Sequence, residues 1–337
     1  MSASQKAPSR QRTFYPGRVP SPDGVRSRRS LSSDQPGRRD HRSLARGLPA
    51  ERCGSVSTLS ARSRIVSPYL KHEEDRMKLG FIGTGAITEA IVTGLLRAQA
   101  DVTEILVSER SSVISARLAD ASDRVRICSD NQDIVEGSEL VVLAIRPQDA
   151  HAALSPLRFS EGQHVCSLIA TVEAETLADW IGTPLDIFRA IPLPSVAALS
   201  GVTALFPYDP VGEKVFGPLG TVIGAKTLDE FDAYATASSL MGTYFGILEL
   251  AAEWLRENGA ERDAAQNYLN AVFLGLTKTG SEADGTPFET LREEHSTPGG
   301  LNEQMFATFI SSGGAAALTT ALDAVADRVR KARQCRS

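Results

Sequence analysis

The chain has 337 residues, of which 42% are hydrophobic and 23% are charged, and its formal net charge is −5. This length is typical of two folded domains, whose core needs no disulfide or metal to stabilise it. The longest uninterrupted apolar runs are much shorter than a bilayer span, which argues against a transmembrane protein. The spacing of the four cysteines and five histidines matches no metal-binding motif.

The charge is divided unevenly along the chain. Residues 1–76 hold 16 Lys and Arg against 7 Asp and Glu, whereas the remainder holds 20 against 34. This first segment is rich in Ser, Arg, Pro and Gly and has no apolar period, so we expect a disordered basic extension. Three interpretations remain open: a targeting segment, an arm that touches nucleic acid or anionic lipid, and translation from a start upstream of Met77.

From Lys78 to about residue 225, strand-like and helix-like segments alternate. Leu140–Ile145 is a continuous apolar run of the kind that is buried on both faces of a parallel sheet. The alternation predicts an α/β fold, in which residues 77–225 form a doubly wound, Rossmann-like domain. Further strands are expected at Leu79–Ile82, Glu104–Ser108, Val165–Ala170, Ile187–Ala190 and Val202–Phe206, and helices at Glu89–Ala98 and Ser112–Leu118.

The turn after the first strand reads Gly83-Thr84-Gly85-Ala86-Ile87-Thr88, with Thr where a third Gly or Ala is usual. The first glycine permits the tight turn, and the second lets the backbone approach a pyrophosphate at a helix N-terminus. Because the turn joins a strand to a helix, it predicts dinucleotide binding rather than an ordinary glycine turn.

The end of the second strand bears on the choice of cofactor. Glu109 could accept a hydrogen bond from the ribose 2′-OH of NAD, whereas Arg110, with the hydroxyls of Ser108, Ser111 and Ser112, suits the 2′-phosphate of NADP. The pattern favours NADPH and leaves NAD open. The alternative is that Glu109 and Arg110 are an ordinary solvated pair.

Residues 226–333 carry helical patterns, so we expect an all-helical second domain. Helices are expected around Phe245–Leu255, Ala264–Leu276 and Ala315–Val329. Their apolar stripes are broader than one small bundle needs, which is consistent with helices shared between two chains. Met241, Met305 and the phenylalanines of this part are expected in a core.

Two short segments carry distinctive motifs: Val141–Gln148 reads V-V-L-A-I-R-P-Q, and Ser296–Gly300 reads S-T-P-G-G. They resemble the V-V-x-A-V-K-P-Q and T-S-P-G-G motifs of the pyrroline-5-carboxylate reductases. The resemblance runs from about residue 77 to residue 330 and also includes Met77–Ala98, Ser129–Asn131, Arg189–Pro192 and Gly201–Leu205. The resemblance implies NAD(P)H-dependent reduction of 1-pyrroline-5-carboxylate, a cyclic imino acid, to L-proline. It also implies a homodimer or higher homo-oligomer, and we expect a cytoplasmic protein without nucleic-acid or membrane partners.

The resemblance also implies roles for single residues, which add to those already inferred after the second strand. The predicted cofactor-binding residues are Ile82, Gly83, Thr84, Gly85, Ala86, Ile87, Ser108, Arg110, Asn131, Ala144, Ile145, Arg146 and Pro147. Of these, Ile82–Ile87 would hold the pyrophosphate, Asn131 would contact the adenosine half, and Ala144–Pro147 would line the cofactor near its nicotinamide end. The substrate carboxylate is expected at Gly299, Gly300, Leu301 and Asn302, with Ser296 and Thr297 orienting the imine or relaying a proton. Independently of the family, a glycine turn that opens a helix offers unpaired N–H groups to a carboxylate, although it can also be a plain helix start.

Three departures from the family lie in the second half of the chain. Leu193 replaces an amide side chain, Ala237–Thr243 keeps little of the family's S-G-S-G-P-A-Y, and Leu301 and Asn302 replace small or hydroxyl residues. Two alternatives therefore remain: a related NADP-dependent reductase of another imine or carbonyl, and a non-catalytic NADP-binding sensor. His295 is a further candidate proton donor, although a surface or packing role is the commoner one for His.

Overall fold

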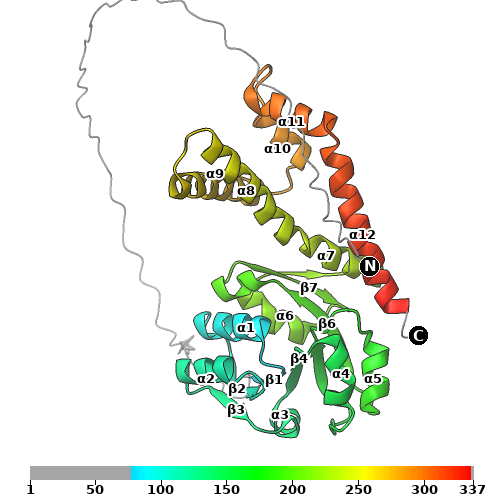
Figure 1. Ribbon diagram of the computed structural model, residues 1–337. Coiled ribbons are helices and arrows are strands. Elements are labelled where there is room, and N and C mark those ends of the chain that lie inside the picture. Colours follow the sequence, from blue (N-terminus) through cyan, green and yellow to red (C-terminus); the bar gives the residue numbers. More distant parts are fainter. Residues whose placement is uncertain (1–76, 335–337) are drawn as a thin grey trace, which may run out of the picture. The chain divides into compact units, whose positions relative to one another are not determined.

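The computed structural model describes residues 77–334, with side chains to residue 331 (Figure 1). The basic extension expected at residues 1–76 lies outside the described residues. The first part of the described chain forms a sheet covered by helices, and the part from Leu228 to Gln334 consists of helices. The predicted fold class, a Rossmann-like domain followed by a helical domain, is confirmed.

A single eight-stranded sheet, of order β3-β2-β1-β4-β5-β6-β7-β8, forms the centre of the first domain. From β3 to β6 all neighbours are parallel, so their carboxyl ends lie at one edge. The strand order reverses between β1 and β4, which is where doubly wound sheets open a crevice for ligands. The strands are β1 (Met77–Ile82), β2 (Val102–Ser108), β3 (Val125–Cys128), β4 (Leu140–Leu143), β5 (His164–Ser167), β6 (Asp186–Pro192), β7 (Gly201–Phe206) and β8 (Gly220–Gly224).

Helices cover both faces of the sheet, because its inner strands are apolar on both sides. In β4, Leu140 and Val142 belong to the core of one face, and Val141 and Leu143 belong to the core of the other. The first core includes residues of α1 (Ala86–Arg97), α2 (Ser112–Ala121) and α6 (Pro210–Phe216). The second includes residues of α3 (Asn131–Gly137), α4 (Pro147–Leu154) and α5 (Ala174–Ile181).

The last two strands run in the opposite direction to the others. β7 is antiparallel to β6, and β8 is parallel to β7. A parallel crossover needs a dozen or more residues, whereas only the short segment around the 3₁₀ turn η2 (Pro194–Ala198) joins β6 to β7. The sequence patterns did not indicate this reversal, nor the strands β3 and β8.

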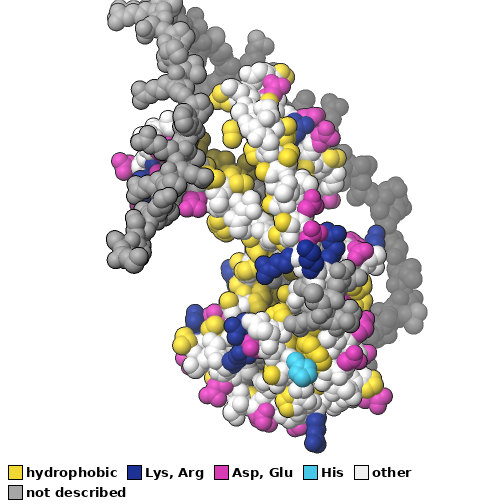
Figure 2. Space-filling model, turned by 45° about the vertical axis from the view of Figure 1, so that its right-hand side comes forward, with side chains coloured by type: hydrophobic (Ala, Val, Ile, Leu, Met, Phe, Trp, Pro, Cys, Tyr) yellow, Lys and Arg dark blue, Asp and Glu magenta, His cyan; other side chains and the backbone are white. Residues whose placement is uncertain are grey.

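The helical part exposes many large apolar side chains (Figure 2). Met241 is 42% exposed, Met305 70% and Phe288 85%, so the expectation that the methionines and phenylalanines form a core is wrong for most of them in the single chain. Phe231 is buried next to the sheet, and Phe273 is partly buried. The helices are α7 (Leu228–Ser238), α8 (Leu240–Glu257), α9 (Arg262–Glu282), α10 (Phe288–Glu294), α11 (Leu301–Ser311) and α12 (Gly314–Gln334).

Within residues 77–334, no single helix has the length and apolar composition needed to cross a membrane. Leu301–Ser311 and Gly314–Lys331 pass that test only together, as a pair bent by 58°.

Candidate functional site

The first glycine of the predicted loop is required by the backbone. Gly83 has φ +103°, a conformation that L side chains rarely adopt, and a Cβ there would lie 2.3 Å from the carbonyl oxygen of Ala144. The Ala144 N–H in turn donates to the carbonyl of Ile82 at 2.9 Å. The loop after β1 is therefore in direct contact with the loop after β4.

Hydroxyl groups fix this loop to the end of β2. The Ser108 Oγ accepts a hydrogen bond from the Gly83 N–H at 3.0 Å, and the Thr84 Oγ1 donates to the Ser108 carbonyl at 2.6 Å. Thr88, which occupies the place of the third glycine, donates its hydroxyl to the Gly83 carbonyl at 2.7 Å. All three side chains are buried. Ser108 thus holds the loop in shape, a role that the phosphate-binding prediction for its hydroxyl did not include.

The second glycine leaves an open cradle at the start of α1. Gly85 is the N-cap of α1, has no side chain to cap the first turn, and has nothing within 4 Å of where a Cβ would be. Helix N-termini with uncapped N–H groups attract anions. The residues present therefore fit the pyrophosphate of a dinucleotide, which Ile82, Ala86 and Ile87 would border.

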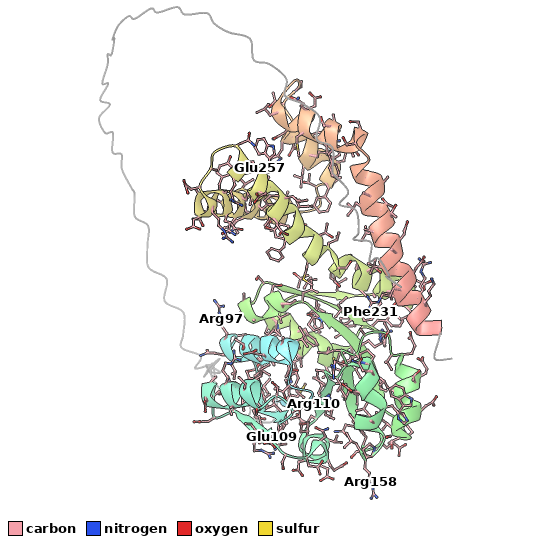
Figure 3. All side chains as sticks on the ribbon, in the orientation of Figure 1. Arg97, Glu109, Arg110, Arg158, Phe231 and Glu257 are labelled. Atoms are coloured by element: carbon pink, nitrogen blue, oxygen red, sulfur yellow. The ribbon has the colours of Figure 1, made fainter. Side chains whose placement is uncertain are left out.

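One arginine follows each of the two strands that flank β1 and its glycine loop. Arg110 follows β2 (labelled with Glu109 in Figure 3), and Arg146 and Ile145 follow β4, just before Pro147 begins α4. Both guanidinium groups donate to the same oxygen, Oδ2 of Asp149, at 3.0 and 2.9 Å. Hydrogen bonds from Arg146 and then Arg110 lower the pKa of the Asp149 carboxyl. Asp149 was not among the predicted site residues.

Asn131 begins α3, directly after β3, and so lies at the same edge of the sheet. The preceding Asp130 is the N-cap, and its carboxylate accepts from the Gln132 N–H at 2.9 Å. The structure therefore brings together at one edge the residues that were predicted to bind the cofactor from four separate strand ends.

The predicted substrate turn precedes α11. Gly299 has φ +72°, and the Gly300 N–H donates to the Thr297 carbonyl at 2.8 Å. Gly300 is the N-cap and, like Gly85, brings no capping side chain. The Gly299 N–H donates to a carboxylate oxygen of Glu303 at 2.6 Å, so the turn already binds a carboxylate of its own chain.

The neighbouring side chains make local hydrogen bonds. The Ser296 hydroxyl donates to the Arg292 carbonyl at 2.7 Å, and the Asn302 amide donates to the His295 carbonyl at 2.7 Å. His295 is exposed, and its Nδ1 lies 2.8 Å from the Leu291 carbonyl oxygen. Leu301 is 83% exposed. These contacts stabilise the turn, and the roles expected for Ser296 and Thr297 stay predictions.

The predicted residues thus form two groups, one at the sheet edge and one between α10 and α11. Among residues 77–334, no hydrogen bond or ion pair joins the two groups. Sequence reasoning missed Asp149 and Glu303, although both are acids in the first turn of a helix. The i,i+3 spacing of Arg146 and Asp149, and of Gly300 and Glu303, was a signal that could have indicated both.

Comparison with known proteins agrees with this two-part arrangement. Residues 78–171 match a family described as NADP oxidoreductase coenzyme F420-dependent, and residues 229–332 match pyrroline-5-carboxylate reductase dimerisation. Pyrroline-5-carboxylate reductase 2 of Bacillus subtilis is 26% identical over 240 residues, which are 67% of this chain and 84% of the relative.

Two solved structures share the fold. The pyrroline-5-carboxylate reductase of Coxiella burnetii has a TM-score of 0.67 at 24% identity, over 77% of this chain and 99% of its own. The pyrroline carboxylate reductase of Plasmodium falciparum, solved with NADP bound, has a TM-score of 0.64 at 16% identity, and the match covers 76% of this chain and 98% of that one. The two family matches cover the two parts of the chain, and each match contains one of the two groups of predicted site residues. The chain belongs to the pyrroline-5-carboxylate reductase family.

Proposed function

We propose that this protein reduces 1-pyrroline-5-carboxylate to L-proline with NADPH. The family consists of NAD(P)-dependent oxidoreductases that act on a CH–NH bond. The observation that carries the assignment of an imino acid is the turn before α11, whose Gly299 N–H binds a carboxylate at 2.6 Å. A turn that binds the carboxylate of Glu303 has the chemistry to bind the carboxylate of a substrate.

The cofactor part of the proposal rests on the sheet edge. Gly83 and Gly85 would admit the pyrophosphate. Arg146 was expected near the nicotinamide end, but its guanidinium shares the Asp149 carboxylate with Arg110, so both arginines would face the 2′-phosphate that distinguishes NADPH from NADH. Ala144, Ile145 and Pro147 would border the cofactor on the β4 side, and Asn131 would border it on the β3 side. When bound, the dihydronicotinamide supplies a hydride to the C=N carbon.

The protein's own contribution is position and electrostatics. The turn Gly299–Asn302 would hold the ring carboxylate, which fixes the distance and angle of the imine carbon. A protonated cyclic imine is already electrophilic, so no strong general acid is required of the protein. Ser296 and Thr297 would orient the ring or hold a proton near its nitrogen.

A homodimer or larger homo-oligomer and a cytoplasmic location belong to the same proposal. The match to a dimerisation family over residues 229–332 supports the dimer. So do the exposed apolar side chains of that part, among which Leu250 is 74% and Trp254 is 62% exposed. Single chains rarely leave so many large apolar groups in water.

The test follows absorbance at 340 nm with the full chain, NADPH and 1-pyrroline-5-carboxylate. We expect oxidation of NADPH with formation of proline, and a KM at least about tenfold higher for 1-pyrroline, which lacks the carboxylate. Gly300→Asp adds a negative charge to the turn and a Cβ that would lie 2.7 Å from the Thr297 carbonyl oxygen, so it should abolish turnover while NADPH binding persists. Unchanged turnover in this variant, or equal KM values for the two imines, would refute the carboxylate assignment.

A second candidate, reduction of an imine with an apolar substituent, is favoured by one observation. Leu193, which stands where the family has an amide, follows β6 at the edge that carries the cofactor group. With Ala237 and Ser238 it lines a mostly apolar cavity of about 240 Å³. A panel of cyclic imines with and without alkyl substituents would decide, because this candidate predicts the higher kcat/KM for the alkylated members.

A further inference from the structure

Three charged side chains form a bridge across the cofactor edge. The Arg110 and Arg146 guanidinium groups both donate to Oδ2 of Asp149, at 3.0 and 2.9 Å. The two arginine side chains are 54% and 69% exposed, whereas that of Asp149 is 29% exposed. The three groups together carry one net positive charge. We call them the Asp149 bridge.

The bridge lies at the topological switch point of the sheet. Arg110 follows β2 and Arg146 follows β4, and these are the two strands that flank β1 and its glycine loop. Ligands of doubly wound sheets bind in the crevice at this point, outside the carboxyl ends of the strands. A dinucleotide seated on the Gly85 cradle therefore meets both arginines and the acid between them.

The acid is anchored on its own helix. Asp149 lies in the first turn of α4, and its N–H donates to the Arg146 carbonyl at 3.0 Å. A carboxylate in the first turn of a helix is also stabilised by the helix dipole. The side chain is thus held ionised between the two guanidinium groups, where it occupies a position that suits an anion.

We propose that Asp149 sets the preference between NADPH and NADH, because its carboxylate competes with the cofactor 2′-phosphate for Arg110 and Arg146. This inference rests on the proposed use of a nicotinamide cofactor. Guanidinium groups bind phosphate and carboxylate with the same paired N–H geometry, so one anion substitutes for the other. In the wild-type protein, the 2′-phosphate must displace the Asp149 carboxylate from the two arginines, which lowers the net affinity for NADPH. NAD, which lacks the 2′-phosphate, has no such competition to overcome.

Asp149→Asn removes the competing charge and nearly preserves the shape of the side chain. The charge of the bridge then rises from one to two, and one unit charge near the protein surface changes phosphate affinity by about three- to tenfold. We expect NADP⁺ to bind tighter by that factor, whereas the Kd of NAD⁺ changes less than about twofold. Arg110→Gln acts in the opposite direction and weakens NADP⁺ binding by at least about tenfold.

Isothermal titration calorimetry of the full chain with NADP⁺ and with NAD⁺ tests the proposal. Glu175→Gln is the matched control, because Glu175 is an exposed acid in the first turn of α5, on the same face of the sheet. The ratio of Kd for NAD⁺ to Kd for NADP⁺ is expected to rise in Asp149→Asn, fall in Arg110→Gln and stay unchanged in the control.

An unchanged or lower ratio in Asp149→Asn overturns the proposal, because it would make Asp149 a support for the arginines rather than a competitor. If Asp149→Asn fails to fold, as judged by circular dichroism, an unchanged ratio in both Arg110→Gln and Arg146→Gln overturns it instead. The titration contains no imine, so a failure of the proposed reduction leaves this measurement decisive.

Discussion

Alanine at Gly83 and alanine at Gly85 are expected to separate folding from cofactor binding. At Gly83, φ is +103° and the new Cβ would lie 2.3 Å from the backbone oxygen of Ala144, which cannot move without shifting the loop after β4. At Gly85, φ is −99° and the new Cβ meets nothing within 4 Å. The same chemical change therefore meets backbone in one position and open space in the other.

The expected magnitudes follow from these surroundings. For Gly83→Ala, the unfavourable φ costs about 1–3 kcal/mol and the clash costs a similar amount, so the free energy of unfolding is expected to fall by roughly 2–6 kcal/mol. For Gly85→Ala, the loss of a good N-cap residue costs about 1 kcal/mol or less. Its methyl group, however, would fill the cradle proposed for the pyrophosphate, so NADP⁺ affinity is expected to fall by at least about tenfold.

Urea unfolding followed by circular dichroism, together with calorimetric titration of NADP⁺, measures both quantities on each variant. Gly242→Ala is a control, because Gly242 lies in α8 and a Cβ there also meets nothing within 4 Å. If Gly85→Ala bound NADP⁺ as well as the wild type, the cradle at the start of α1 would not be the pyrophosphate site. If Gly83→Ala were as stable as the wild type, the argument from φ and the Ala144 contact would be wrong.

Three further predictions concern other parts of the chain. Glu303→Gln removes a like charge from the turn that we propose binds the substrate carboxylate. The KM for 1-pyrroline-5-carboxylate is therefore expected to fall by about threefold at constant kcat, and an unchanged KM would count against that turn. Arg189→Met removes the guanidinium that lies 3.3 Å from the Glu173 carboxylate in a mostly buried ion pair. Urea unfolding should show that the free energy of unfolding falls by about 2–4 kcal/mol. A fall of less than about 1 kcal/mol would contradict the importance of the pair. Burial raises the pKa of the Cys166 thiol well above its usual range. The thiol therefore ionises more easily in the unfolded chain, so the free energy of unfolding is expected to decline as the pH rises above the unfolded thiol pKa of about 8.5. Iodoacetamide labelling at pH 8, read by peptide mass spectrometry, should be many times slower at Cys166 in the native protein than in urea, and equal rates would refute this.

Much of the fold could be predicted because its signals are local. The apolar run at Leu140–Ile145 indicated a central strand, and β4 is buried on both faces. The strand β3, in contrast, carries two exposed residues, Arg126 and Ile127, between its buried ends, so its sequence lacks a strong apolar pattern. The direction of β7 depends on the length of its connection to β6, which apolar patterns do not reveal.

The candidate site divides in the same way. The glycine loop was predictable because the positive φ at Gly83 and the open cradle at Gly85 both require glycine, and two glycines at this spacing can be recognised in the sequence. The Asp149 bridge depends on two loops that meet only after β2, β1 and β4 have aligned, so Arg110 and Asp149 could not be paired from their separation of 39 residues. The exposed methionines were misjudged because an apolar stripe does not tell whether its own chain or a second one covers it.

The strand order also has a consequence for how the chain folds. Each neighbouring pair of strands in the sheet is consecutive along the chain, with one exception: β1 pairs with β4, so that Gly80 lies beside Val141. Pairing β1 with β4 requires the closure of a long loop, whose entropy cost comes before any stabilising contact forms between the two strands. Contacts between segments that are distant in sequence slow folding. We call this β1–β4 pairing the seam. The loops proposed to bind the cofactor lie at the end of this same seam. A dinucleotide that binds the loops of both strands would therefore slow the opening of the part of the sheet that is hardest to assemble.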